Sequence, residues 1–134
     1  RTVYRAPANK FVADFIGETN WLPGTVAAVN GDGVEVETTA GHFVVASTGA
    51  ALTRGMRVAL GFRPEAVVIA TAAVNCLRTR IAHVTYLGEF EQYRLELSDG
   101  VSLKAFEQNP REIRQLGAAL EVHVRPQDCL VLPA

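Results

Sequence analysis

Cysteine is scarce in this chain, and its two residues, Cys76 and Cys129, lie 53 positions apart. Two cysteines are too few for a disulfide scaffold and suit a reducing compartment. No CxxC pair occurs, which argues against a zinc site. Cys129 lies in an apolar run, where a cysteine commonly behaves as a small hydrophobic residue. The pattern assigns no further role to either cysteine.

An excess of charge of one sign is also missing. The formal net charge is −1, so no long-range field would attract polyanions or anionic lipid. No stretch reaches the ~18 apolar residues that a membrane-spanning helix needs. The apolar share of 49% and the charged share of 20% are typical of a globular domain. The chain starts at Arg1 without an initiator methionine or a signal peptide, and we expect it to be a piece of a longer protein.

Convergent reactive groups are missing as well. The three histidines are scattered without the spacing of metal ligands, and each is expected to be a surface or structural residue: His42, His83 and His123. Glu89 and Glu91 could point the same way on a strand, and paired carboxylates can do acid–base work or bind cations. A solvated strand face explains them equally well. We therefore expect no catalytic residue and no metal site.

Nucleotide-binding motifs do not occur either. The sequence holds no G-x-x-x-x-G-K-[ST] and no G-x-G-x-x-G after a strand, and Gly31-Asp32-Gly33 is expected to be a hairpin tip. We expect no cofactor in this chain and no ATP hydrolysis by it alone. Basic residues and an aromatic residue that could meet a single strand, Arg78, Arg80 and Tyr86, are few. With a net charge of −1, nucleic acid is not an expected partner.

The sequence does contain a repeated Arg-Pro motif. Arg63-Pro64-Glu65 and Arg125-Pro126-Gln127 each lie eight residues after a glycine, Gly55 or Gly117. Each comes after an alternating apolar strand and precedes an apolar run, and the two copies are 62 residues apart. An arginine before proline is forced into extended geometry, so each proline should mark a corner that leaves a strand. At the first corner we expect an ionic contact between Arg63 and Glu65, with an anion site as the alternative.

Further matches upstream extend this duplication. Asp32-Gly33-Val34 recurs as Asp99-Gly100-Val101, and Phe15-Ile16-Gly17-Glu18 recurs as Tyr86-Leu87-Gly88-Glu89. The spacing drifts from 71 to 67 to 62, as loops of unequal length would produce. Two units are too few for a solenoid, which needs at least about three repeats. At 134 residues, two half-size lobes with one shared core fit better than two independent domains.

The expected elements are one short helix and then a series of strands. Phe11, Val12, Phe15 and Ile16 share a helical stripe, which predicts a helix over about 8–16 that must dock on another surface because it is short. After it, the apolar period is two, and turn signals favour a sandwich or small barrel. The predicted strands include 34–38 paired with 43–45, a hairpin of 93–97 and 101–105 around Asp99-Gly100, and 120–124. A helical turn is expected at 111–115.

The first residues resemble a known junction. Tyr4-x-x-Pro7-x-x-x-Phe11-Val12-Ala13-x-Phe15-Ile16-Gly17-x-x-Asn20 is similar to the segment where the ATPase subunits of ABC importers leave their nucleotide-binding domain. The rest of the chain resembles their carboxy-terminal transport-associated domain, whose Arg-Pro-Glu signature looks like Gly61-Phe62-Arg63-Pro64-Glu65. Thr85-Tyr86-Leu87-Gly88 resembles its second-half signature, and Asn20-Trp21-Leu22-Pro23-Gly24 is most similar to polyamine importers. The resemblance covers nearly all of the chain.

The resemblance implies an all-β fold of two oligonucleotide-binding-like barrel lobes, with one short N-terminal helix. Residues 1–20 would be the junction, 21–75 the first lobe and 76–134 the second, with one shared core. It implies six junction residues: Tyr4, Pro7, Phe11, Phe15, Gly17 and Asn20. Four others would shape barrel corners or contact a ligand: Arg63, Glu65, Glu89 and Arg125.

The resemblance also implies a function for the parent protein. It would be an ABC-type transport ATPase that uses ATP and Mg for solute uptake, with polyamine as the candidate solute. Partners would be the nucleotide-binding domain of the same chain, a second ATPase copy and the membrane permease subunits, at the cytoplasmic face of the bacterial inner membrane. The chain itself would be a non-catalytic regulatory tail. The alternatives are a sensor of a small ligand or oxyanion and a single-stranded nucleic-acid-binding module.

Overall fold

The computed structural model describes residues 18–48, 51–108 and 113–134. The predicted helix at 8–16 lies outside these residues, as do the junction residues from Tyr4 to Gly17. Over the described part, the prediction of an all-β chain is confirmed. It forms ten strands and two 3-10 turns, η1 (Pro64–Ala66) and η2 (Pro126–Asp128). Residues 113–115, the described part of the predicted helical turn at 111–115, are not helical.

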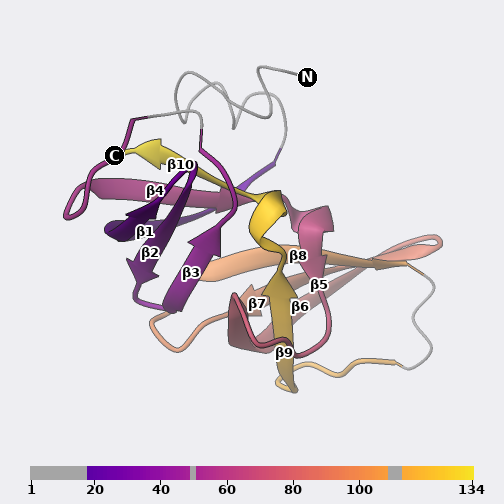
Figure 1. The fold of residues 1–134 in the computed structure, drawn as a ribbon. Coiled ribbons are helices and arrows are strands. Elements are labelled where there is room, and N and C mark those ends of the chain that lie inside the picture. The colour runs from indigo at the N-terminus through magenta and orange to yellow at the C-terminus, as the bar shows by residue number, and fades with distance from the viewer. Residues whose placement is uncertain (1–17, 49–50, 109–112) are drawn as a thin grey trace.

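The strands form two five-stranded antiparallel sheets (Figure 1). The first sheet contains β1 (Asn20–Asn30), β2 (Gly33–Thr38), β3 (Gly41–Val45), β4 (Arg57–Phe62) and β10 (Cys129–Pro133). The second contains β5 (Val67–Val68), β6 (Cys76–Leu87), β7 (Phe90–Glu96), β8 (Ser102–Gln108) and β9 (Ala119–Val124). Their orders are β10-β4-β1-β2-β3 and β5-β9-β6-β7-β8.

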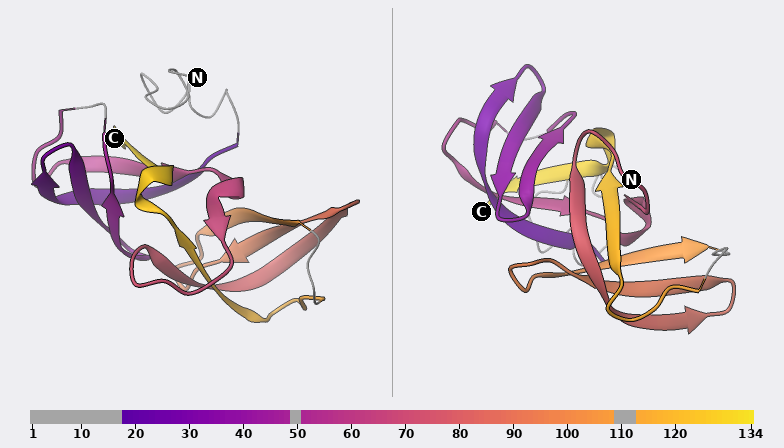
Figure 2. Two further views of the ribbon diagram at one scale, coloured as in Figure 1. Left: turned by 45° about the vertical axis from the view of Figure 1, so that its right-hand side comes forward. Right: turned by 90° about the horizontal axis from the view of Figure 1, so that it is seen from below.

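The two sheet orders are the same order written for each half of the chain, except that the last strands are exchanged. β5 belongs to the first half and pairs with β9, whereas β10 belongs to the second half and pairs with β4. Neither sheet is therefore made of one half alone (Figure 2). The exchanged strands cross the predicted boundary between residues 75 and 76 in both directions. The division of the chain into two lobes at that boundary stays a prediction.

The two Arg-Pro corners start these exchanges. Arg63 precedes η1 with φ −77° and ψ 151°, and Arg125 precedes η2 with φ −66° and ψ 145°, so both arginines are extended as a following proline requires. Each 3-10 turn then leads directly into its exchanged strand, β5 or β10. The repeat seen in the sequence at these corners is thus a repeat of structure.

The match between Asp32-Gly33 and Asp99-Gly100 does not align equivalent turns. The turn at Asp32 joins β1 to β2, and its structural counterpart is the turn at Gly88-Glu89, which joins β6 to β7. Asp99-Gly100 lies between β7 and β8 and corresponds to the turn between β2 and β3. The reason is that aspartate and glycine suit many tight turns, so a shared dipeptide does not establish which two strands it joins.

The hydrophobic core is continuous between the sheets. Alternate residues of the predicted strands point inward as expected, and the buried ones among them include Val34, Val36, Val58, Leu60, Phe62, Tyr93, Leu95, Leu97, Leu103, Ala105, Leu120, Val122 and Val124. The predicted hairpin pairs Tyr93 with Ala105 and Leu95 with Leu103. The rings of Phe43 and Phe62 stack with centroids 6.3 Å apart. Residues of both sheets belong to this one cluster, so neither half buries its apolar face by itself.

On the outer face of the first sheet, Trp21 lies over a glycine. Trp21 of β1 is the cross-strand partner of Gly61 of β4. A Cβ atom built on Gly61 would lie 2.6 Å from Cζ3 of the Trp21 ring. The missing side chain of Gly61 is therefore what lets the indole lie close to the sheet.

Replacing Gly61 with alanine should displace this indole. We expect Gly61→Ala to lower the free energy of unfolding by about 1–3 kcal/mol through overpacking, measured by urea denaturation. The same substitution in a Trp21→Leu background should cost clearly less, because the ring atoms that clash are gone. An equal cost in both backgrounds would show that the Gly61–Trp21 contact is not the cause.

Candidate functional site

Asn20 links the first strand of one sheet to the edge strand of the other. It is the only predicted junction residue within the described residues, and it is buried. Its side-chain nitrogen donates to the Lys104 carbonyl at 2.9 Å, and the Lys104 backbone N–H donates to its side-chain oxygen at 2.8 Å. The amide of Asn20 thus satisfies both backbone groups of one residue on β8, as a neighbouring strand would.

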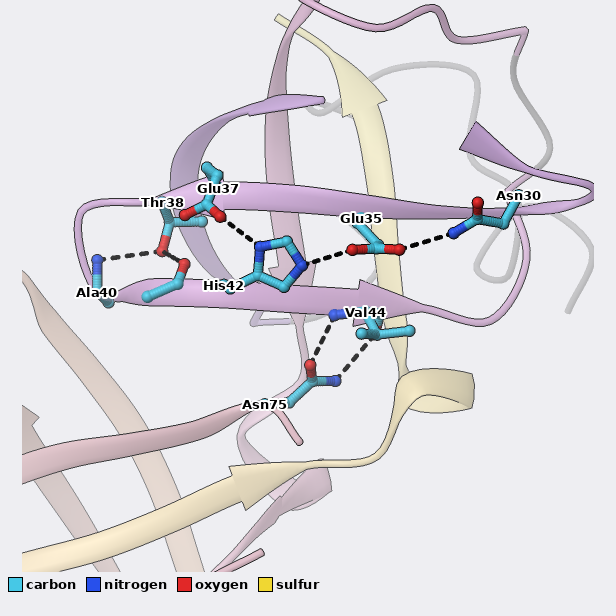
Figure 3. A network of polar contacts seen from close by, with 9 residues as sticks. Asn30, Glu35, Glu37, Thr38, Ala40, His42, Val44 and Asn75 are labelled. Carbon is cyan, nitrogen blue, oxygen red and sulfur yellow. Dashed lines mark hydrogen bonds and ion pairs between the residues drawn. The ribbon is translucent and has the colours of Figure 1, made fainter. Parts of the chain in front are cut away.

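Asn75 makes the equivalent link in the opposite direction (Figure 3). The Val44 backbone N–H donates to its side-chain oxygen at 2.7 Å, and its side-chain nitrogen donates to the carbonyls of Val44 and Val124, each at 2.9 Å. Asn75 is almost fully buried and has a positive φ of 55°. Asparagine tolerates this left-handed conformation better than most residues. Each asparagine therefore covers one edge strand, β8 or β3, of the other sheet.

A cavity of about 450 Å³ opens at the Asn20 link. Its walls come from the start of β1, from η1, and from β7 and β8, so it lies on the seam between the two sheets. The lining residues are Glu18, Thr19, Asn20, Trp21, Pro64, Arg94, Ser102, Leu103 and Lys104. Two of them are basic and one is acidic. This seam cavity is the candidate site.

The charges of the seam cavity are unevenly paired. The Lys104 ammonium contacts the Glu18 carboxylate in an ion pair. Arg94 lies directly opposite Lys104 on the neighbouring strand and is exposed. No carboxylate of the described residues lies within ion-pair distance of Arg94. The cavity therefore presents one cation that is neutralised and one that is not.

The predicted corner residues stay at the corners, although Pro64 lines the cavity. Arg63 contacts Glu65 with 3.8 Å between Nη1 and Oε2, which confirms the expected ionic contact. Arg125 instead donates from Nε to Oδ2 of Asp128 at 2.9 Å. The repeat places the neutral Gln127 where Glu65 stands in the first copy, and the carboxylate of Asp128, one residue later, forms the ion pair instead. As ligand contacts these arginines stay predictions, and the structure places neither of them in the cavity wall.

Glu89 and Glu91 do not form a pair on one strand face. Glu89 lies in the turn before β7, whereas Glu91 lies on β7 and accepts a hydrogen bond from the Tyr93 hydroxyl at 2.9 Å. That hydroxyl is also 2.7 Å from Glu107, and Arg114 makes a two-pronged contact with Glu107. The Arg114 guanidinium lowers the pKa of Glu107, and burial raises the pKa of Tyr93. Spacing alone suggests the wrong partner for Glu91 because it ignores the turn.

His42, expected to be a surface or structural residue, is held between two carboxylates (Figure 3). Its Nε2 is 2.7 Å from Glu35, its Nδ1 contacts Glu37, and the Asn30 side chain donates to Glu35 at 2.8 Å. With a carboxylate at each ring nitrogen, the ring satisfies both contacts when it carries both protons. The hydrogen bonds to Glu37 and then Glu35 raise the pKa of His42. This network is exposed, and none of its residues lines the seam cavity.

The remaining candidates are inert in the described structure. Burial raises the pKa of the Cys129 thiol to about 12, so it stays protonated and is a poor nucleophile. The His123 ring contacts the Ala70 carbonyl at 2.9 Å. Among the described residues, no group of three or more His, Cys, Asp or Glu side chains is placed to hold a metal ion. The same residues contain no helix of the length and apolarity that crossing a membrane demands.

Comparison with known proteins places these features in a family. A family model described as the TOBE domain matches residues 60–132. The spermidine/putrescine import ATP-binding protein PotA of Rubrobacter xylanophilus is 42% identical over 135 residues, covering 98% of this chain and 36% of that protein. PotA of Pseudomonas fluorescens is 36% identical over 115 residues, covering 81% of this chain and 31% of that protein. The chain thus spans about a third of the length of these curated relatives.

A solved structure shares the two-sheet architecture. The cytoplasmic molybdate-binding protein ModG, with molybdate bound, aligns with a TM-score of 0.74 over 86% of this chain and 96% of that chain. The sequence identity is 15%, so the likeness shows the fold alone. That fold is all-β and resembles the oligonucleotide-binding type, as the family resemblance of the sequence implied.

Asn75 should be among the most sensitive polar positions in the described structure. Asn75→Ala removes three hydrogen bonds to the backbone, two with the part-buried Val44 and one with the buried Val124, and leaves alanine at a positive φ. We expect a loss of about 1–3 kcal/mol or more of unfolding free energy by urea denaturation. Glycine adopts a positive φ without steric cost, so Asn75→Gly should recover part of this loss. If neither variant is destabilised, the asparagine link is not structural.

The His42 contact should strengthen as pH falls. Because the folded-state pKa is raised, the contribution of this contact to stability is complete below the unfolded-state pKa and is lost as pH rises through the folded-state pKa. An NMR titration of the His42 ring should give a pKa above 6.5, the ordinary value. Glu37→Gln should bring that pKa down, and Glu35→Gln should do so by less. An unchanged pKa in both variants would contradict the assignment.

Proposed function

Because the chain belongs to the TOBE domain family, we propose that it is the non-catalytic regulatory tail of an ABC importer ATP-binding subunit. The observation that carries the proposal is the 42% identity with a PotA protein over almost the whole of this chain. The parent would hydrolyse ATP with Mg to drive solute uptake, and a polyamine would be its solute. Its partners would be the nucleotide-binding domain of the same chain, a second ATP-binding subunit and the membrane permease subunits.

We further propose that the tail regulates the ATPase through its position, by docking on neighbouring domains rather than by chemistry of its own. The described residues offer no set of reactive groups, while their core, exchanged strands and asparagine links tie both sheets into one unit. In such a unit a displacement of one sheet would move the other sheet with it. Docked on the ATPase domain or on its twin, it would bias how readily the two nucleotide sites close, a shift between populations of conformations. The parent would therefore lie at the cytoplasmic face of the inner membrane.

A second function, sensing of a small ligand, is favoured by one observation. The seam cavity of about 450 Å³ falls within the range of roughly 300–1,000 Å³ of small-molecule sites. It carries charged and hydroxyl side chains from both sheets, so an occupant would touch both. Saturable binding of a small solute to the cavity would support this function, because a ligand that binds the folded state raises its stability. The net charge of −1 leaves nucleic-acid binding without a specific observation in its favour.

Phe15 should couple the tail to the rest of the parent. In the full-length protein we expect Phe15→Ala to change how ATPase activity responds to assembly with the permease, while the β-sheets stay folded. ATPase assays with and without the permease, together with circular dichroism, measure both effects. Phe90→Ala is the matched control, since Phe90 is 43% exposed at the far hairpin of the second sheet. If Phe15→Ala leaves ATPase response, assembly and stability unchanged, the positional proposal fails.

A further inference from the structure

The seam cavity has the chemistry of an anion site, and we propose that it binds a small phosphate ester, with the phosphate between Arg94 and Lys104 and the organic part against Trp21. This inference rests on the proposed ligand-sensing function and names its ligand class. The imported solute of the PotA relatives, by contrast, is a cation. The proposed ligand therefore has the opposite charge to that solute.

The positive side chains of Arg94 and Lys104 lie close enough to repel each other. Arg94 of β7 and Lys104 of β8 are direct cross-strand partners on the outer face of the second sheet. Like charges in this position are destabilising. Glu18 offsets the charge of Lys104, and the described residues provide no acid for Arg94. An anion bound between the two side chains would offset the repulsion, and the arginine fork suits two oxygens of one phosphate.

A polyamine fits this cavity poorly. Ammonium groups bind to carboxylates or aromatic faces, and the described wall of the cavity offers one carboxylate, Glu18, and one aromatic face, Trp21. That carboxylate is already paired with Lys104. A polyamine would have to break this ion pair and then lie beside both Lys104 and Arg94 without a counter-ion. The charge of the wall therefore selects against cations.

The volume and the remaining wall indicate more than a free inorganic ion. A cavity of about 450 Å³ is in the range of organic ligands, and a single tetrahedral oxyanion would fill a small part of it. Trp21 and Pro64 provide apolar lining from the first half of the chain, and Ser102 adds a hydroxyl from the second. The Trp21 indole is held in place by its contact with Gly61. A ring or sugar attached to the phosphate would lie against this wall.

The cavity is lined by residues of both sheets, so a bound ligand would contact both. Trp21 belongs to β1, whereas Arg94 and Lys104 belong to β7 and β8. Asn20, which lines the same cavity, already bonds to the backbone of Lys104. An occupant would add contacts in parallel with this link and stabilise the present arrangement of the sheets.

Trp21 is the single tryptophan of the chain, so its fluorescence reports this site directly. We would titrate the 134-residue protein with adenosine 5′-monophosphate, inorganic phosphate, adenosine and spermidine at constant ionic strength. The monophosphate should change the fluorescence saturably. Arg94→Gln should weaken that binding by about tenfold or more, because a charge-assisted contact is lost. Lys104→Gln is a second variant with the same expectation, in case the first is poorly folded.

Two further variants sharpen the test. Glu18→Gln removes the competitor for Lys104 and should tighten binding. Arg78→Gln removes the same charge from the second sheet outside the cavity, where Arg78 is paired with Glu121, and should leave binding unchanged. Equal binding of inorganic phosphate with the same Arg94 dependence would support phosphate recognition by Arg94 but would overturn the assignment of an organic part to the Trp21 wall.

The remaining outcomes overturn the inference in distinguishable ways. Saturable binding of spermidine without any effect of phosphate compounds would overturn the anion site and leave ligand sensing standing. Binding of adenosine alone, or binding of the monophosphate that Arg94→Gln and Lys104→Gln do not weaken, would do the same. If none of the four compounds changes the fluorescence or the melting temperature, both the anion site and ligand sensing by this cavity fail, while the positional role is untouched.

Discussion

Two asparagine side chains, Asn20 and Asn75, do for the edge strands what a neighbouring strand would otherwise do. Each pairs through its amide with both backbone groups of one edge residue, Lys104 or Val44, on the opposite sheet. An unpaired edge strand is a hazard and an unpaired buried backbone group is costly. Since β5 and β10 are exchanged as well, the two halves depend on one another for strands, for edges and for a shared core.

This mutual dependence suits a protein that works through attachment. Two lobes joined flexibly would move separately, and a change at one lobe would have little effect on the other. One rigid unit keeps its surfaces in a fixed arrangement. The candidate ligand site lies at one of the two asparagine links, and its lining includes Trp21, Arg94 and Lys104. Binding there would act on the same contact that holds the sheets together. The proposed sensing role and the structural role would therefore meet at Asn20.

Much of the fold could be predicted because strand alternation and proline geometry are local. The inward residues Leu120, Val122 and Val124 are expected from period two, and the Arg-Pro corners from the constraint that proline places on its neighbour. The strand exchange could not be predicted, since a chain that leaves a corner carries no local mark of the sheet it will join. Turn dipeptides misled the alignment of the repeat for a related reason: Asp-Gly suits any tight turn. Asn75 gave no signal, because its partners are 31 and 49 residues away.

The central claim is that the two sheets form one cooperative unit through the asparagine links. Native-state hydrogen exchange of the Val44 and Lys104 backbone amides tests it most directly, because both amides belong to edge strands and donate to an asparagine side chain. The account predicts that both exchange with the free energy of global unfolding, as core amides do. Exchange of one amide at a much lower free energy, with the other still protected, would show that the sheets open separately and would contradict the account.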